Sequence, residues 1–430
     1  MKHINTLLFF LLIFSHIQGQ NVPPQDIKKV APNDTIVPWK GPPEDQLKEI
    51  KKVKIEKLSD STGNEPKKTI LVDTTKQNKY GDLLNDDTAY NKKYPLWIPL
   101  TMVVGTNIIV WSLDRYLINA PYSHIGLETW QYNIRKGWEW DDDRFGINFI
   151  GHPYSGSMLF NTGRANGYNY LESGAFAVTG SLMWEYFGEN TRPSYNDIIT
   201  TPVNGAFLGE MFYRLSSNVL DDRTRGAERV FREILAGIID PKRGLNRLLQ
   251  GKTFRTTNKE IYQKEPLNVT LYGGLHKINY EPGSVLGSGS GNIMFNLKFD
   301  YGNPFELRLR KPFDFFKFRM EMDFGVGRKI LSDVNGYGIL FGQNYNYPKH
   351  SILVGGFQYY DYWDNKSFEL GAIAFGGGVF SKLPVSKTSI LYTNASITNT
   401  YPHYFSCWHN RNENTTSIGS VSNSIFYNGF

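Results

Sequence analysis

Residues 148–217 read NFIGHPYSGSMLFNTGRANGYNYLESGAFAVTGSLMWEYFGENTRPSYNDIITTPVNGAFLGEMFYRLSS. Glu185 and Glu189 are four residues apart, so on a helix they share one face. A stripe of small side chains precedes them at the same spacing: Ser173, Ala177 and Ser181. Small side chains allow helix backbones to approach closely. The stretch therefore predicts closely packed helices with acidic groups among them.

A second small stripe follows in the same stretch. Gly205 and Gly209 lead into Glu210, Tyr213 and Arg214. Glu210 and Arg214 stand four residues apart, in the order that favours an ion pair along a helix. We therefore predict a second tightly packed helix with buried charge.

Composition limits the functions that the chain can have. The 430 residues carry a net charge of +6, and aromatic residues make up 15%. No basic cluster is interleaved with stacking aromatics, so we expect no nucleic-acid partner. Abundant Tyr, Phe and Gly are typical of membrane β-barrels. The single cysteine, Cys407, cannot form an intrachain disulfide, and no cysteine-based metal site is expected.

The N-terminus predicts export. Residues 1–20 have a short basic start and an apolar core at Leu7–Phe14, as in a cleaved signal peptide. Residues 21–93 are rich in Lys, Asp, Asn, Pro and Thr, which predicts a flexible charged linker. The uncharged run Pro95–Leu113 has the length of a membrane span, but Pro99 and Gly105–Asn107 weaken it. We expect a buried or interfacial helix there.

The helical domain is predicted over residues 94–260. A helix is expected to begin near His152-Pro153, because proline suits the first helical turn. Ser194 and Asp197 have the spacing of a helix N-terminal capping pair. We expect a break at Thr201-Pro202 and a turn at residues 241–244.

From residue 269 the hydrophobic period becomes two. Residues 316–326 read FKFRMEMDFGV, and residues 295–301 (FNLKFDY) and 305–310 (FELRLR) alternate in the same way. Short turns between such runs predict an antiparallel meander over residues 261–398. After Thr398 the alternation decays, so residues 399–430 are predicted to form an irregular tail.

The strands have one apolar, aromatic face and one charged face. A soluble barrel turns its apolar side inward, whereas a membrane barrel turns it to lipid. With the signal peptide, the pattern favours an outer-membrane-type barrel of about eight strands, whose interior charges pair with one another. The predicted fold is therefore α+β, with a small-residue-rich helical domain followed by this barrel.

Long motifs carry a family resemblance. The runs NFIGHPYSGSMLF, WEYFGE, PSYNDIITTPVNGAFLGEMFYRLS and DPKRGLNRLLQG resemble the bacterial family called domain of unknown function 3943, over roughly residues 80–260. The strand-rich half also looks like that family's C-terminal portion. The resemblance implies a secreted, outer-membrane-associated protein of Gram-negative bacteria. The family has no established reaction, so the resemblance assigns no catalytic residue.

Several polar side chains lie among small and aromatic residues, where an unpaired charge is costly. One interpretation makes His152 a base or ligand and Glu185 with Glu189 an acid–base or metal pair. The other makes the acids members of a buried polar network. This network would include Glu210 with Arg214, Glu185 or Glu189 with Arg164 or Arg192, and His152 and Asp197 as helix caps. No nucleophile elbow, zinc-protease histidine pair or phosphate loop is present, and no cofactor or metal is predicted.

Three hypotheses follow from the sequence. The leading one is a non-enzymatic outer-membrane protein with a periplasmic helical domain docked on a small barrel and with lipid as its partner. The second is an envelope enzyme that modifies a lipid or glycan at the His152 and glutamate site. The third is a soluble periplasmic protein whose strands form a sandwich. The sequence does not decide whether the protein is an enzyme, and it names no protein partner.

Overall fold

The computed structural model describes residues 93–140, 143–258, 260–279, 289–307, 309–324, 330–364, 368–384, 390–407 and 423–426. All of them belong to one compact unit of the chain, Thr75–Phe430. The predicted signal peptide and the predicted linker up to residue 92 lie outside the described residues, as does most of the tail beyond Cys407.

Helices occupy the first half of the described chain. They are α3 (Trp97–Ser112), η4 (Leu113–Ile118), η5 (Pro121–Ser123), α4 (Leu127–Lys136), η6 (Ile147–Gly151), α5 (His152–Arg164), α6 (Tyr170–Phe187), α7 (Asp197–Val219), α8 (Gly226–Ile239), α9 (Pro241–Leu249) and η7 (Lys252–Phe254). As predicted, a helix begins at His152, with Pro153 in its first turn. The backbone N–H of Asp197 donates to Ser194 Oγ, which is one of the two contacts of the predicted capping pair. The N–H of Ser194 donates to Glu185 instead, and α7 begins at Asp197 with Asn196 at its N-cap position.

Strands follow in the second half. They are β1 (Leu267–Asn279), β2 (Gly289–Tyr301), β3 (Leu309–Arg310), β4 (Phe316–Phe324), β5 (Leu331–Tyr347), β6 (His350–Asp364), β7 (Phe368–Pro384), β8 (Ile390–Cys407) and β9 (Asn423–Phe426). They form one antiparallel sheet in the order β1-β2-β4-β5-β6-β7-β8-β9, with β3 paired to β5. The predicted meander is confirmed. The predicted barrel is not, because the sheet is open and no pairing joins β1 to β9 among the described strands.

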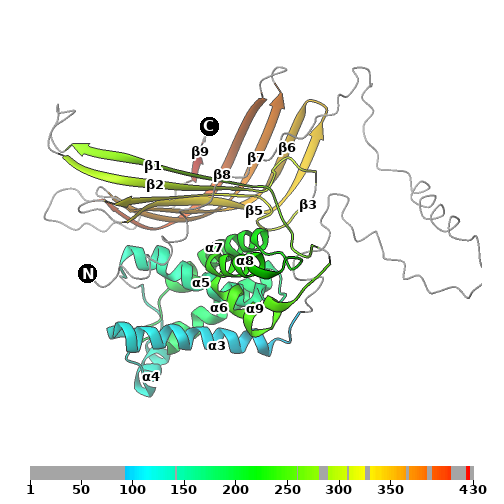
Figure 1. The fold of residues 1–430 in the computed structure, drawn as a ribbon. Helices are drawn as coiled ribbons and strands as arrows, with labels where there is room; N and C mark the ends of the chain where they lie inside the picture. The colour runs from blue at the N-terminus through cyan, green and yellow to red at the C-terminus, as the bar shows by residue number, and fades with distance from the viewer. Residues whose placement is uncertain are drawn as a thin grey trace, which may run out of the picture. The chain divides into compact units, whose positions relative to one another are not determined.

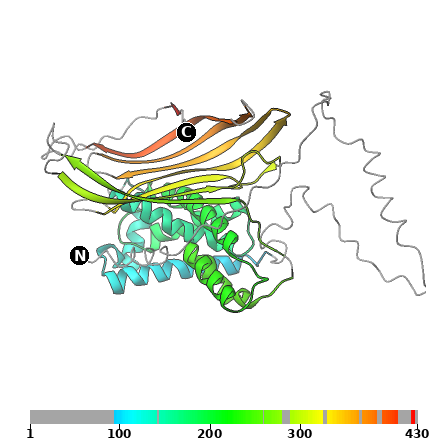
Figure 2. The same cartoon turned by 45° about the horizontal axis from the view of Figure 1, so that its top comes forward.

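The helices pack on one face of the sheet (Figures 1 and 2). Phe207, Leu208 and Met211 of α7 share a buried core with sheet residues that include Phe316 and Phe318. Tyr170 Oη lies 3.0 Å from Gln358 Oε1, and Gln358 Nε2 donates to the carbonyl of Val203. The apolar faces of these strands were predicted to contact lipid. That prediction was wrong for Phe316 and Phe318, which lie against helix α7.

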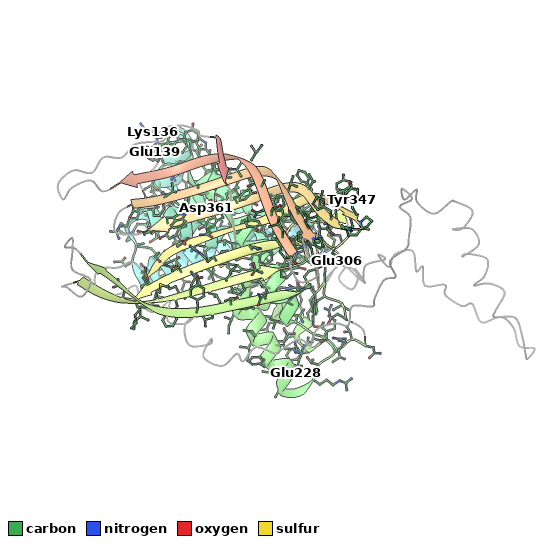
Figure 3. The ribbon with its side chains drawn as sticks, turned by 90° about the horizontal axis from the view of Figure 1, so that it is seen from above. Lys136, Glu139, Glu228, Glu306, Tyr347 and Asp361 are labelled. Atoms are coloured by element: carbon green, nitrogen blue, oxygen red, sulfur yellow. The ribbon has the colours of Figure 1, made fainter. Side chains whose placement is uncertain are left out.

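The opposite face of the sheet carries the charges. Lys317 Nζ lies 3.6 Å from Asp300 Oδ1, Arg319 pairs with Asp333, and Asn296 Nδ2 donates to Glu321 Oε2 over 2.9 Å. Asp361 lies among the central strands in Figure 3, and burial together with the charge of Asp333 raises its pKa to about 7. Charges on this face do pair with one another, but on an open sheet and not in the interior of a barrel as predicted. The same face also holds a second apolar cluster: Phe315, Ile339, Leu353, Phe357 and Phe380.

Both small stripes lie in the helical core. Ser173, Ala177 and Ser181 are buried on α6, and Gly205 and Gly209 are buried on α7. Helices α5 and α7 cross where Gly156 meets Gly205. A Cβ at Gly156 would lie 1.8 Å from the carbonyl oxygen of Thr201. Backbones can meet this closely only where no side chain intervenes.

Helix α3 together with η4 has the length and composition of a membrane span. The run Trp97–Ile118 passes that test with a mean hydropathy of 1.3, and 17% of it is buried, although one such helix is weak evidence for a membrane protein. Only Pro99, Val103 and Thr106 of α3 are buried. Residues 95–113 were expected to form either a buried or an interfacial helix, and the prediction of a buried helix is therefore wrong.

Four local predictions also differ from the structure. Helix α7 runs through Pro202, because a proline in its second turn removes only one hydrogen bond from a long, well-packed helix. Residues 241–244 begin helix α9 instead of forming a turn. Of the expected strand over residues 305–310 only β3 is formed, while residues 304–307 form turns and bends. Arg310 of β3 donates to the carbonyls of Asn303 and Glu306. Strand β8 continues beyond Thr398 to Cys407.

Candidate functional site

His152 and the acids near it form the site that the sequence predicted. His152 Nε2 lies 3.5 Å from Asp197 Oδ1 and 3.7 Å from Asp143 Oδ2. Burial by itself lowers the pKa of His152. The interaction with Asp143 and the charges of Asp197 and Glu189 outweigh burial, so this pKa lies above its ordinary value. The structure thus brings His152 together with Asp197, which the sequence analysis had placed only as a cap.

The two glutamates do not form the predicted pair on one helix. Helix α6 ends at Phe187, so Glu189 lies beyond it and is half-buried, whereas Glu185 is buried. Glu185 Oε2 accepts a hydrogen bond of 2.7 Å from the backbone N–H of Ser194. Asn133 Nδ2 donates to the carbonyls of both glutamates. Glu185 therefore fixes the loop that enters α7.

A chain of buried ion pairs connects the helices to the sheet side of the protein. Arg164 Nε lies 2.7 Å from Glu210 Oε2, and Arg214 Nε lies 2.9 Å from Glu210 Oε1. Arg214 Nη1 continues the chain to Asp314 Oδ1 at 3.1 Å, in the loop before β4. The predicted Glu210–Arg214 pair is confirmed. Arg164 binds Glu210, however, and Arg192 binds Glu139 in place of Glu185 or Glu189.

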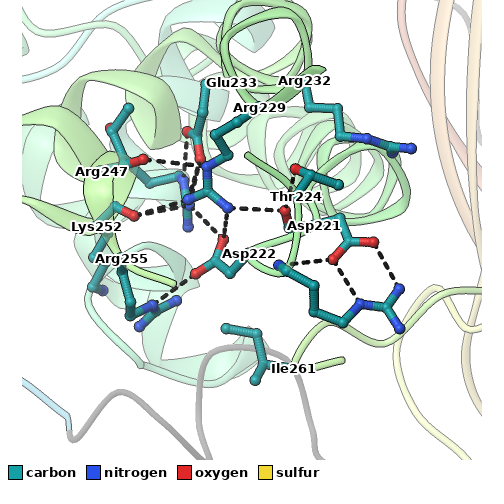
Figure 4. Close-up of polar contacts among 12 residues, drawn as sticks. Asp221, Asp222, Thr224, Arg229, Arg232, Glu233, Arg247, Lys252, Arg255 and Ile261 are labelled. Atoms are coloured by element: carbon teal, nitrogen blue, oxygen red, sulfur yellow. Dashed lines mark hydrogen bonds and ion pairs between the residues drawn. The ribbon is translucent and has the colours of Figure 1, made fainter. Parts of the chain in front are cut away.

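A second charge cluster, centred on Asp222, was not predicted from the sequence. Asp222, in the loop after α7, is fully buried and contacts three guanidinium groups (Figure 4). The distances to its carboxylate are 2.9 Å from Arg229 Nη1, 2.9 Å from Arg247 Nη2 and 2.7 Å from Arg255 Nε. Tyr262 donates to the same carboxylate over 2.7 Å. Of the three arginines, only Arg247 lies in the run DPKRGLNRLLQG, so that run gave no sign of the cluster.

Within the described residues, no group of three or more His, Cys, Asp or Glu side chains is arranged to hold a metal ion. The buried acids of the helical side, Glu185, Asp197, Glu210 and Asp222, each have a positive or hydrogen-bonding partner. The arrangement can hold helices in place and can shift the protonation of His152.

Residues 137–242 match the family model described as a domain of unknown function, DUF3943. The chain contains a DUF3943 domain. The DUF3943 match is shorter than the expected span of residues 80–260, and it ends before the first strand, so the resemblance of the strands to this family is not supported. No curated protein and no solved structure matches the chain. The DUF3943 segment includes both small stripes, His152 and the first residues of α9.

We expect the contribution of His152 to stability to depend on pH. Its pKa is raised in the folded protein, so its stabilising effect is complete below the ordinary value of 6.5 and is lost as the pH rises through the folded pKa. The free energy of unfolding of wild type minus that of His152→Gln should therefore decrease between pH 5.5 and pH 8.5. Urea titrations at several pH values measure this difference. Asp197→Asn should lower the pKa of His152 in an NMR titration, and an unchanged pKa would contradict the assigned contact.

Proposed function

We propose that the protein is a non-enzymatic, membrane-associated protein of the Gram-negative envelope, located at the outer membrane with its helices on the periplasmic side. One observation carries this proposal: several helices turn charged side chains inward and apolar side chains outward. Helix α9 buries Lys242, Arg243 and Arg247 and exposes Leu245 and Leu248. A helix at the surface of a soluble protein shows the reverse pattern.

Other surfaces support the same proposal. Helix α3 contains no charged residue and exposes apolar side chains along its length: Trp97, Val104, Ile108 and Ile109. Strands β1 and β2, at one edge of the sheet, also expose apolar side chains: Val269, Leu271, Ile293 and Phe295. Exposed apolar areas of this extent are typical of membrane or protein interaction sites.

The buried acids favour a structural over a catalytic role. Glu210 lies between two arginines, and Glu185 holds the backbone of Ser194. Groups that are held in this way contribute to the position of helices, and a buried ion-pair network does not by itself indicate catalysis.

Envelope fractionation tests the proposal. The full chain, expressed in a Gram-negative host, should stay in the membrane pellet after a high-salt wash and should be released by detergent. A periplasmic maltose-binding protein in the same cells provides the soluble control. Complete release of the chain by salt would exclude membrane association.

An envelope lipid- or glycan-modifying enzyme is the second candidate, because His152 is half-buried beside an exposed carboxylate, Asp143, and a buried one, Asp197. We expect Glu185→Gln, Glu189→Gln and His152→Gln to complement a deletion strain in every growth or envelope phenotype that wild type complements. If these variants fold and reach the membrane but fail to complement, the enzyme candidate is preferred.

A further inference from the structure

Strand β1 is the outermost strand at one edge of the sheet, at the other end of the strand order from β9. It pairs with β2 along its full length of 13 residues, and among the described residues no strand pairs with its other side. Part of its backbone N–H and C=O groups therefore points away from the sheet, as in any edge strand. A second extended chain is the partner that can bind all of these groups at once.

The edge of β1 lacks the features that usually keep a second strand away. Natural edge strands carry charged side chains, prolines or bulges. Residues 267–275 of β1 read LNVTLYGGL, with no charged residue and no proline, and their register with β2 is unbroken. Four aliphatic side chains of this stretch are between 37% and 88% exposed: Leu267, Val269, Leu271 and Leu275. The strand can therefore accept a partner strand and has apolar surface to bury against it.

The pattern of this stretch is symmetric about Leu271. Successive residues of a strand alternate between its two faces, so the four exposed aliphatic residues, which all have odd numbers, share one face. In an antiparallel pair of β1 strands with Leu271 opposite Leu271, Leu267 lies opposite Leu275 and Val269 lies opposite Gly273. The apolar row of one copy then continues into the apolar row of the other, on the same face of the joined sheet.

Other registers of this pair fit less well. A shift by one residue would turn the apolar row of one copy to the opposite face, beside Asn268 and Thr270 of the other. A shift by two residues would place Glu265 or Lys277 opposite a leucine at the end of the stretch. The register centred on Leu271 avoids both conflicts, and it brings no like charges together at the symmetry axis.

A second copy of the chain is therefore the partner that suits this edge. The isologous contact of a symmetric dimer requires a surface that complements itself, and residues 267–275 meet this requirement. Residues 408–422 of the same chain read WHNRNENTTSIGSVS, in which polar residues predominate and apolar residues do not alternate, so they match β1 poorly. We propose that two copies of the chain form a dimer by antiparallel pairing of their β1 strands. The inference goes beyond the proposed function and does not depend on it, because exposed strand edges pair in water as well.

Disulfide cross-linking of the purified full chain tests the register. Leu271→Cys, made in a Cys407→Ser background that removes the single native cysteine, would place two thiols opposite each other in the dimer. Directly opposite residues of antiparallel strands have Cα atoms about 4.5–5.5 Å apart, a separation that a disulfide can span. Mild oxidation should therefore convert most of this variant to a covalent dimer. Phe341→Cys in the same background is the matched control and should not cross-link, because Phe341 is exposed on β5, between β4 and β6.

Sedimentation velocity in mild detergent measures the association of chains without added cysteines. Wild type should sediment as a dimer that dissociates on dilution. Leu271→Lys should raise the dissociation constant of the dimer about tenfold or more, because two charges meet at the axis and two leucines lose their apolar partner. Phe341→Lys should leave the dissociation constant unchanged. Leu271 is more than half exposed, so the lysine variant should fold like wild type, and its urea midpoint checks this.

Four results would overturn the inference. A wild-type chain that is monomeric at every concentration would mean that β1 stays free or is covered by the chain itself. A dimer that survives Leu271→Lys would place the contact elsewhere. Oligomers larger than a dimer would indicate a head-to-tail contact between unlike edges. A dimer that Leu271→Lys abolishes but that does not cross-link through Leu271→Cys would show that the register centred on Leu271 is wrong.

Discussion

Alanine at Gly156 is expected to lower the free energy of unfolding by about 3 kcal/mol, at the upper end for an overpacked core. The added Cβ would lie 1.8 Å from the carbonyl oxygen of Thr201 and 3.1 Å from Gly205 Cα. Both neighbours are backbone atoms of α7, so no side chain can rotate away, and the two helices must separate. Because α5 and α7 form the centre of the helical core, we expect the loss to appear as a lower urea midpoint of the whole chain.

Gly174→Ala is the matched control for this substitution. Gly174 lies in helix α6, and nothing is within 4 Å of the position that its Cβ would take. Alanine is a better helix former than glycine, so this variant should be more stable than wild type by about 1 kcal/mol. Circular dichroism during urea titration measures both variants. Equal midpoints for Gly156→Ala and Gly174→Ala would show that the close crossing of α5 and α7 is not required.

The close packing of helices α6 and α7 was readable from the sequence, whereas Gly156 of α5 as the partner of Gly205 was not, nor was the element that covers the strands. Small residues repeated every four positions on α6 and α7 specify close packing, whatever surrounds the helices. The alternation of Phe316 and Phe318 with charged residues fixes which side of β4 is apolar. The alternation does not show whether lipid or a packed helix covers the apolar side, because apolar side chains face both.

The candidate site was readable only where its partners are close in sequence. Glu210 and Arg214 are one helical turn apart, so their pairing was predictable. Glu189 was misplaced because α6 ends at Phe187, and a spacing of four residues has no meaning beyond a helix end. Asp222 was missed because its arginines come from α8, from α9 and from the segment after η7, and no local spacing links them.

Removal of the Asp222 charge is expected to cost about 3–5 kcal/mol of the free energy of unfolding, as for other buried ion pairs that lose one partner. Asp222→Asn keeps the size of the side chain but leaves Arg229, Arg247 and Arg255 without the carboxylate that they share. Glu233 contacts two of these arginines and cannot neutralise all three. The excess positive charge then lies in the core of the hairpin of α8 and α9 and must draw in water or push the two helices apart.

The control for Asp222→Asn is Glu228→Gln, which removes a negative charge from the exposed side of the same helix pair. Glu228 is 58% exposed and pairs with Arg232 one turn away, so its loss should change stability by less than about 1 kcal/mol. Thermal unfolding at low and high salt compares the two variants, and only the effect of Glu228→Gln should decrease with salt.

A double-mutant cycle separates a lost network from a general loss of packing. In the Arg255→Gln background, Asp222→Asn should cost less than it does in wild type, because one of the three arginines that need the carboxylate is already gone. The coupling follows from the shared carboxylate oxygens and not from the volume of either side chain. Strictly additive costs would mean that Asp222 and Arg255 act independently, and the assignment of Asp222 as the centre of the cluster would then be wrong.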